Sequence, residues 1–314
     1  MKLTNKLGLP QPIVDAVAAD DYSRGASDIS VTQLLSPPRM SALIGAHYDE
    51  LEEDVSDRIW SLLGRGIHVA LERAEKVAIP EQRLFMRVGD FVISGAMDRI
   101  EVIRADGGSG SKIQDYKTAF VKEMVYGVKV EREQQLNIYR VLLAVNGYPV
   151  EELEAIFFLR DWSKVQAFDA NKAPRLGDGP VSYPQVPVVV HKVALWDIND
   201  AYAFIAGRVA VHMAARDAYA AAIGTDPLSA TTQSVLPECD DEERWVHAPS
   251  FAVMKAGGKK ASTVVETEAE AVAYIEAHPK DKYSVQTRPG RSIRCQFYCS
   301  AAQVCDQWKG MQVV

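Results

Sequence analysis

Two aspartates and a lysine form the pattern in this sequence that is best suited to chemistry. Asp98 lies in the stretch GAMDRIEV, and Asp115 and Lys117 lie in KIQDYKTA. Side chains at i and i+2 of a β-strand point to the same face, so we expect Asp115 and Lys117 to project together. Two carboxylates and a lysine on one face are what a divalent metal and a phosphodiester require. The pattern therefore predicts a metal-dependent nuclease.

Each of these residues has a role in that chemistry. Asp98 and Asp115 would supply carboxylate ligands, and the backbone carbonyl of Tyr116 is a further candidate ligand. A metal held there lowers the pKa of a bound water and polarises the scissile phosphate. Lys117 would orient that water or stabilise charge that develops on the phosphoryl oxygens. An ordinary explanation also exists, because aspartates often end strands and D-x-K pairs often line solvated strand faces. Asp98 fits that explanation poorly, since its neighbours are apolar and a buried charge must be paired or metal-bound.

The elements around these residues follow a recognisable order. Three strand-like runs, 83–88, 91–102 and 112–118, are separated by glycine-containing turn signals and predict an antiparallel meander. Apolar residues at helical spacing precede the meander at 54–76, and a second helix is expected from 132 to 145. We further expect a loop-like segment to residue 27, a short helix capped at Ser30 or Thr32, strands at 153–160 and 188–195, a polar loop at 168–187, an alanine-rich helix to 223 and a linker at 224–239.

The overall bounds are those of an ordinary globular chain. It has 314 residues, of which 47% are hydrophobic and 25% charged, values typical of globular proteins. No apolar run approaches the roughly 20 residues needed to cross a bilayer, and the N-terminus lacks the apolar segment of a signal peptide. We therefore expect a cytoplasmic protein with no membrane partner, divided into a domain at 1–225 and a smaller one at 226–314.

Net charge weighs mildly against a nucleic-acid partner without excluding one. The formal charge is −7, whereas phosphate binding requires a basic surface. Carboxylates of a metal site count as negative in that sum, however, and a bound metal inverts their field. Two local basic clusters are equally consistent with solvated surface and with DNA contact: Lys255, Lys259 and Lys260, and Arg288, Arg291 and Arg294.

Four motifs in order resemble the RecB-like branch of the PD-(D/E)XK nuclease superfamily. They are G-x-x-x-H within GRGIHVALE (64–72), G-x-x-D (95–98), D-Y-K-T (115–118) and Q-x-x-x-Y (135–139) within EREQQLNIYR. Together they span roughly residues 60–145. The resemblance implies an α/β fold with a mixed central sheet flanked by helices, and Mg²⁺- or Mn²⁺-dependent cleavage of DNA.

The same resemblance assigns further residues. His68 becomes a metal ligand, and Gln135 and Tyr139 position the lysine or the phosphate. Glu81 is a candidate for the acidic residue that some branches carry ahead of the hairpin; an exposed loop glutamate is the alternative. Exonucleases predominate in the RecB-like branch, so an exonuclease is favoured over an endonuclease. The region that follows the core resembles virus-associated members, which suggests a phage origin, a role in DNA processing or recombination, and a recombination or single-strand-annealing partner protein.

All four cysteines lie in the C-terminal part of the chain. Cys295, Cys299 and Cys305 are closely spaced, and Cys239 lies upstream. Disulfides are unexpected in a cytoplasmic chain, and four thiolates suit an iron–sulfur cluster or zinc. Several RecB-like nucleases carry a C-terminal cysteine trio bound to a 4Fe–4S cluster, with the fourth cysteine ahead of the nuclease core. This chain departs from that pattern, so Zn²⁺ stays open, as do plain buried thiols.

Two alternatives to a nuclease follow from the same residues. The chain could be a non-catalytic DNA-binding or assembly module that retains the fold, although an intact charged cluster argues against this. It could also be a metal-stapled interaction protein in which the motif order is coincidence. The second alternative would be favoured if the strands around Asp98 and Asp115 were not neighbours in space.

Overall fold

The computed structural model describes residues 1–19, 25–105, 108–172, 183–224 and 230–312. The chain forms two compact units, one comprising residues 1–36 and 52–214 and the other residues 37–51 and 215–314. We call them unit 1 and unit 2 and describe each by itself. Among the helices of the described ranges, none is long and apolar enough to cross a membrane.

Unit 1 is built on a mixed six-stranded sheet. Its strand order is β2-β5-β6-β7-β8, and β4 pairs with β5 outside this path. The pairs β2–β5 and β6–β7 are parallel, whereas β4–β5, β5–β6 and β7–β8 are antiparallel. The strands are β2 (Ile29–Ser30), β4 (Ile79–Val88), β5 (Phe91–Ala105), β6 (Gly108–Ala119), β7 (Val150–Leu159) and β8 (Val188–Val193).

Strand β5 pairs with two different strands along one of its edges, and a short stretch between them has no partner on that edge among the described strands. Its first half pairs with β2 at Ile93 and Ser94. Its second half pairs with β6, from the Arg99–Gln114 pair onward. Within the described ranges, no strand pairs with this edge between Ser94 and Arg99. Asp98 lies in that interval, one residue before the two strands begin to pair.

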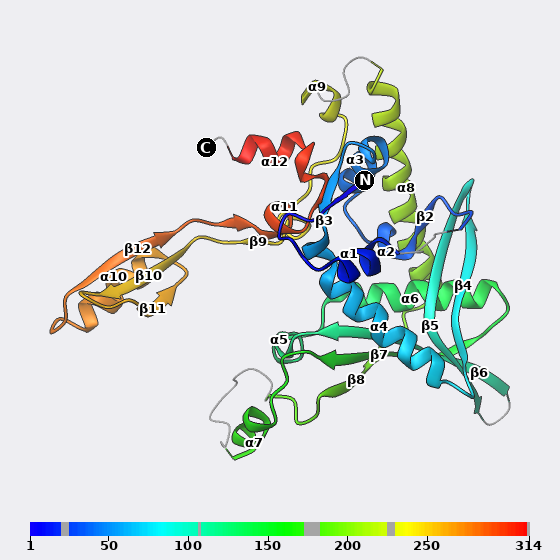
Figure 1. Cartoon of the computed structure of the whole chain (residues 1–314), viewed down its shortest axis with the longest axis horizontal. Helices are drawn as coiled ribbons and strands as arrows, with labels where there is room; N and C mark the ends of the chain where they lie inside the picture. The colour runs from blue at the N-terminus through cyan, green and yellow to red at the C-terminus, as the bar shows by residue number, and fades with distance from the viewer. Residues whose placement is uncertain (20–24, 106–107, 173–182, 225–229, 313–314) are drawn as a thin grey trace. The chain divides into compact units, whose positions relative to one another are not determined.

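Helix α6 (Val130–Val145) packs against strands β4 to β7 (Figure 1). The contact with β5 is close because Gly95 has no side chain. A Cβ atom at Gly95 would lie 2.7 Å from Cε1 of Tyr139 and 2.8 Å from Cδ1 of Leu142. Tyr139 and Leu142 are both buried. The glycine of the G-x-x-D motif therefore lets this helix approach the sheet.

The remaining elements of unit 1 lie before, between and after those strands. They are β1 (Lys2–Thr4), α1 (Gln11–Ala18), α2 (Val31–Leu34), β3 (Glu52–Asp54), the 3-10 helix η1 (Val55–Arg58), α4 (Ile59–Ala74), α5 (Val121–Tyr126), α7 (Lys164–Lys172) and α8 (Ile198–Ala222), which runs on into unit 2. Strands β1 and β3 form a separate parallel pair. Ser30 caps α2 through a reciprocal capping box with Gln33.

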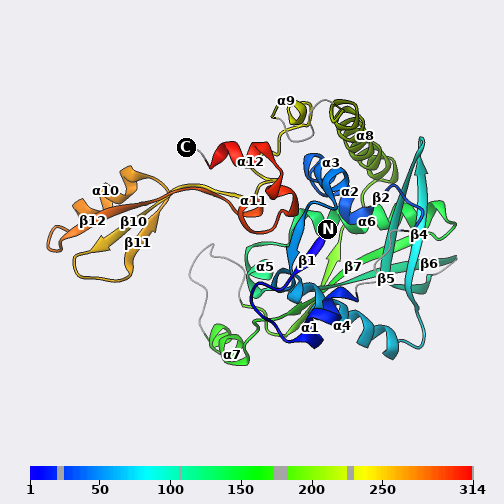
Figure 2. The same cartoon turned by 45° about the horizontal axis from the view of Figure 1, so that its top comes forward.

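Unit 2 contains a three-stranded antiparallel sheet of order β11-β10-β12 with helix α10 packed against it (Figure 2). The chain enters and leaves this part through a short antiparallel pair, β9–β13, in which His247 is opposite Arg291. The elements of unit 2 are α3 (Pro38–His47), α9 (Ala230–Gln233), β9 (Val246–His247), β10 (Ser250–Lys255), β11 (Ala261–Val265), α10 (Glu268–Ala277), β12 (Tyr283–Arg288), β13 (Arg291–Ser292), α11 (Ile293–Phe297), η2 (Ser300–Gln303) and α12 (Asp306–Met311).

The structure confirms the predicted meander and both helices that flank it, and it corrects three expectations. Residues 1–27 are not a loop throughout, since β1 and α1 lie there. The polar loop begins later than expected because α7 extends to Lys172, and the linker contains α9. Part of that loop, residues 173–182, lies outside the described residues. The strands that carry Asp98 and Asp115 are neighbours in the sheet, as predicted, so the observation that would have favoured a coincidental motif order is not made.

Candidate active site

His68, Asp98 and the backbone of Tyr116 form one hydrogen-bonded group. Asp98 accepts hydrogen bonds at both carboxylate oxygens, from the Tyr116 N–H at 2.7 Å and from Nδ1 of His68 at 3.1 Å. The other ring nitrogen of His68, Nε2, lies 3.2 Å from the Tyr116 carbonyl oxygen. The side chain of Asp98 thus takes the place of a ladder partner where β5 and β6 separate. This arrangement links α4, β5 and β6 at one point.

Asp115 and Lys117 form a buried ion pair on β6. Nζ of Lys117 lies 2.5 Å from Oδ2 of Asp115, and the side chains are only 17% and 4% exposed. The contact confirms that the i and i+2 positions of this strand share a face. Their neighbours across the parallel β6–β7 pair are apolar, Ala155 opposite Asp115 and Phe157 opposite Lys117. The pair therefore lies in a setting where an unpaired charge would be costly.

The carboxylates of this group are crowded. Burial raises the pKa of Asp115, and the negative charge of Asp98 raises it further, while Lys117 and Arg132 act in the opposite direction. The pKa of His68 is raised mainly by its hydrogen bond to Asp98, and burial opposes that effect. Two acids and two bases thus influence one another within one cluster. A bound cation would favour the charged form of both carboxylates.

The oxygen ligands available here fit a hard divalent cation, although other side chains of the protein already contact these oxygens. Carboxylate and carbonyl oxygens are the ligands of Mg²⁺, and Asp98, Asp115 and the Tyr116 carbonyl supply them. In the described ranges, no three His, Cys, Asp or Glu side chains are already arranged to hold a metal. The physical reason lies in the contacts above: His68 bridges Asp98 and the Tyr116 carbonyl, and Lys117 covers Asp115. A cation would displace these donors.

Gln135 and Tyr139 are neighbours on α6, as their i, i+4 spacing predicts. Nε2 of Gln135 donates a hydrogen bond of 2.7 Å to the Tyr139 hydroxyl. The Tyr139 ring packs over Gly95, so the Q-x-x-x-Y and G-x-x-D motifs meet through packing. Glu81 lies on β4, but its side chain is outside the described part of the structure.

The sequence analysis missed several charged groups around the cluster. A pocket is lined by His68, Leu71, Glu72, Glu75, Asp98, Arg99 and Tyr116. Glu72 is one helical turn after His68, and that i, i+4 spacing was a usable signal. Glu75 accepts hydrogen bonds from three backbone N–H groups and from Arg99, which lower its pKa to about 2. No local pattern predicts the influence of Arg132 on Asp115.

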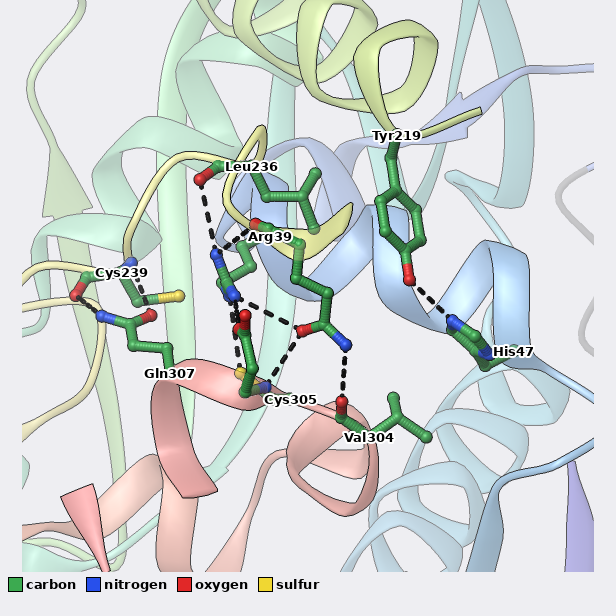
Figure 3. A network of polar contacts seen from close by, with 10 residues as sticks. Arg39, His47, Tyr219, Leu236, Cys239, Val304, Cys305 and Gln307 are labelled. Atoms are coloured by element: carbon green, nitrogen blue, oxygen red, sulfur yellow. Dashed lines mark hydrogen bonds and ion pairs between the residues drawn. The ribbon is translucent and has the colours of Figure 1, made fainter. Parts of the chain in front are cut away.

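The four cysteines lie in unit 2, where a network around Arg39 surrounds two of them (Figure 3). Nε of Arg39 lies 3.5 Å from Sγ of Cys305, and its terminal nitrogens contact Asp306, Gln233 and the Leu236 carbonyl. Gln307 bonds to both the N–H and the carbonyl of Cys239, at 3.0 and 2.9 Å. These contacts hold Cys239 close to the segment that contains Cys305.

The cysteine thiols are near one another without forming a ready-made ligand set. Burial raises the pKa of Cys239 to about 12, with further contributions from Glu243 and from the other three cysteines. Burial likewise raises the pKa of Cys299 to about 11, and Cys295 and Cys305 add to it. In the part of the chain that the structure describes, the cysteines do not meet the geometry of a metal site. The geometry of the described cysteines therefore does not by itself indicate an iron–sulfur cluster.

The basic clusters are placed differently from one another. Lys255, Lys259 and Lys260 are exposed at the β10–β11 connection. Arg288 and Arg291 are also exposed, whereas Arg294 is half-buried and its guanidinium lies 4.2 Å from the centre of the Trp245 ring. Lys255 pairs with Asp281 at 2.7 Å, and Arg294 stacks on Trp245, so both clusters include a side chain with a structural contact.

Comparison with known proteins identifies the class of protein to which this fold and this cluster of side chains belong. The sequence matches the PD-(D/E)XK nuclease superfamily over residues 24–306, so the chain belongs to this superfamily. The α/β fold class predicted from the sequence is confirmed. A solved structure titled "Crystal structure of SSO0001" aligns with a TM-score of 0.43 at 17% identity, covering 63% of this chain and 84% of that chain. A search of curated proteins gave no match.

Proposed function

We propose that this chain is a Mg²⁺- or Mn²⁺-dependent deoxyribonuclease that hydrolyses phosphodiester bonds, acting from DNA ends. One observation carries the proposal. Asp98, Asp115 and Lys117, the residues of the superfamily's motif, lie together where β5 and β6 separate. Asp98 raises the pKa of Asp115 and Lys117 lowers it, and such opposing effects on a buried acid are typical of functional clusters. The negatively charged backbone of DNA is the substrate that this metal chemistry fits.

The proposed roles follow from the contacts. Asp98, Asp115, the Tyr116 carbonyl and His68 would hold the cation, which lowers the pKa of a bound water and polarises the phosphate. Lys117, released from Asp115, would donate hydrogen bonds to the water or to the phosphoryl oxygens. Gln135 and Tyr139 would position the lysine or phosphate from α6. His68 must lose a proton before it can act as a ligand, because both ring nitrogens face acceptors in this structure.

Cleavage of end-labelled linear DNA tests the activity. The purified protein would be incubated with Mg²⁺ or Mn²⁺, beside an EDTA control and the Lys117→Ala variant. Lys112→Ala is a matched control, because Lys112 lies on the same strand, is similarly buried with a side chain 19% exposed, and pairs with Glu101 at 3.2 Å. We expect metal-dependent cleavage that falls about 10²–10³-fold in Lys117→Ala and persists in Lys112→Ala. Linear DNA that survives both metals would overturn the nuclease proposal.

The position of cleavage is tested separately. Survival of covalently closed circular DNA under conditions that degrade linear DNA would identify an exonuclease, whereas nicking of the circle would identify an endonuclease. If DNA binds and is never cut, the alternative of a non-catalytic DNA-binding or assembly module is favoured. The assignment to the RecB-like branch, a phage origin and a recombination or single-strand-annealing partner remain part of this proposal.

We further propose that residues 226–314 form a cysteine-containing subdomain beside a nuclease domain at 1–225, and that Cys239, Cys295, Cys299 and Cys305 hold a 4Fe–4S cluster, with Zn²⁺ as the alternative. The proposal is supported by the proximity of the cysteines, because Cys295, Cys299 and Cys305 all contribute to the raised pKa of Cys239, and a bound cation would compensate thiolates held so close together. Anaerobic purification tests it. Absorption near roughly 400 nm with bound iron indicates a cluster, bound zinc without colour indicates a zinc site, and neither metal indicates plain buried thiols.

A further inference from the structure

An arginine lies between two exposed aromatic rings in unit 1. The guanidinium carbon of Arg160 is 4.3 Å from the centre of the Trp60 ring and 4.1 Å from that of Phe120. Trp60 is the second residue of α4, Phe120 follows β6, and Arg160 follows β7. Three segments that are distant in the sequence therefore build one stack.

The surroundings hold this stack in place. The Arg160 N–H donates a hydrogen bond of 2.9 Å to the Ala119 carbonyl, which joins the ends of β6 and β7. Oδ1 of Asp161 accepts a hydrogen bond of 2.7 Å from the Val121 N–H on the other side of Phe120. These two hydrogen bonds fix the residues before and after Phe120 to the end of β7. The aromatic rings are therefore presented on a rigid frame.

The stack has the marks of a binding site that lacks its ligand. Trp60 is 58% exposed and Phe120 is 43% exposed, although large aromatic side chains are normally well buried. Nε of Arg160 is buried and has no hydrogen-bond partner within the described ranges. No carboxylate there forms an ion pair with its guanidinium. A second cation, Lys122, lies 5.8 Å from the centre of the Phe120 ring. Open aromatic faces and uncompensated positive charge therefore coincide.

This combination matches one class of ligand. Aromatic rings stack with unpaired nucleobases, and adjacent arginine and lysine side chains contact the phosphates of the same strand. A guanidinium held between rings keeps its donors in the plane of the group, which suits bidentate contact with phosphate. Bases inside a duplex are already stacked on one another, so a stacking site of this kind favours single strands and frayed ends.

The stack lies at a suitable distance from the proposed catalytic residues. Phe120 is three residues after Lys117 on β6 and its immediate continuation, so the two Cα atoms are separated by about 10 Å at most. Trp60 lies on α4, the helix that also carries His68. A strand whose phosphate is at Asp98 and Asp115 could therefore reach the stack within a few nucleotides.

We propose that Trp60, Phe120 and Arg160 form a subsite that binds an unpaired nucleobase and its phosphate, and that this subsite makes the protein prefer single-stranded DNA. The proposal rests on the proposed nuclease function, because it places a strand of DNA along this edge of unit 1. It adds a determinant of strand specificity outside the cluster of acids and lysine.

Binding without turnover tests the subsite. Fluorescence anisotropy in EDTA would compare labelled oligothymidylate with a labelled hairpin duplex, for the wild type, Trp60→Ala, Trp60→Phe and Arg160→Lys. Tyr148→Ala is a matched control, since Tyr148 is 41% exposed and lies beyond α6. We expect Trp60→Ala to weaken binding of the oligothymidylate about tenfold, Trp60→Phe to restore most of it, and Tyr148→Ala to change nothing. Arg160→Lys keeps the charge and should still weaken binding. Thermal melting would check that each variant folds.

The outcomes separate the subsite from the nuclease. Unchanged binding by Trp60→Ala overturns the subsite, as does an equal loss for the oligothymidylate and the duplex. If the wild type degrades DNA with Mg²⁺ while Trp60→Ala keeps the same KM for single strands, the subsite is wrong and the nuclease proposal stands. If the wild type binds the oligothymidylate through Trp60 and cleaves nothing, the nuclease proposal fails and the subsite stands.

Discussion

The acid–lysine cluster of unit 1 and the Arg39 network of unit 2 both bury charge, but they satisfy it to different degrees. Arg39 is 3% exposed, and its guanidinium contacts Asp306, Cys305, Gln233 and two backbone carbonyls. In unit 1, Asp115 has one close counter-ion, and the negative charge of the nearby Asp98 disfavours the charged form of Asp115. A buried charge with its donors satisfied stabilises the fold. A buried charge with a like charge nearby can exchange its counter-ion for a ligand at a lower cost in free energy.

Removal of the saturated charge should have the largest effect on stability. Arg39→Ala leaves Asp306 and two carbonyls without their donor, so we expect the free energy of unfolding to fall by about 3–5 kcal/mol. Denaturant titration would measure this. Arg216→Ala is the control, because its pair with Asp217 is exposed and should contribute less than about 1 kcal/mol. Similar effects of the two substitutions would contradict the distinction between the two regions.

A buried base that stays neutral offers a contrast with Arg39. Burial, assisted by the charge of Arg208, lowers the pKa of His212 from 6.5 to about 4. The unfolded chain therefore binds this proton at a higher pH than the folded chain does. Stability is highest above pH 6.5 and falls as the pH is lowered from 6.5 toward 4, by about 3 kcal/mol in total. Unfolding curves at several pH values should show a shallower decline for His212→Gln, and identical slopes would refute this assignment.

Tight packing beside the cluster predicts a smaller effect. Gly95→Ala would place Cβ against Tyr139 and Leu142 at distances that require movement, so we expect a loss of about 1–3 kcal/mol. Gly207→Ala, with no atom within 4 Å of the added Cβ, should instead stabilise α8 by about 0.5–1 kcal/mol. If the melting temperatures of Gly95→Ala and Gly207→Ala moved in the same direction, the close approach of α6 to β5 at Gly95 would not explain the effect.

The smallest effect on stability is expected at the cluster itself. Burial raises the pKa of Asp115, so removal of its negative charge is favourable, but Lys117 then loses its buried counter-ion. Because the two effects oppose each other, Asp115→Asn should change the free energy of unfolding less than the other substitutions do. The same variant should lose cleavage, together with the rise in melting temperature that Mg²⁺ gives the wild type. Thermal unfolding with Mg²⁺ or EDTA measures both properties. If Asp115→Asn were as unstable as Arg39→Ala, the proposed difference between the acid–lysine cluster and the Arg39 network would be wrong.

The sequence predicted those features of the fold and the cluster that depend on local spacing. Strand-like runs separated by glycine-containing turns located β5 and β6, and the i, i+2 positions of Asp115 and Lys117 indicated their shared face. The separation of β5 from β6 at Arg99 depends on which strand pairs with each half of β5, and no local pattern encodes it. Arg39 is similar, since its partners lie about 200 residues away in the sequence. The contact of Trp60, Phe120 and Arg160 also required three segments to be brought together.

The short β9–β13 pair has an evolutionary consequence. Because His247 and Arg291 are opposite one another, the chain returns to its starting point after residues 248–290. A segment with adjacent ends can be gained, lost or exchanged as a cassette, since a tight turn could replace it without rerouting the chain. Homologues that lack β10, β11, α10 and β12 but keep Cys239 and the cysteine trio are therefore structurally permitted. Sequence length between Cys239 and Cys295 should accordingly vary in large steps among relatives.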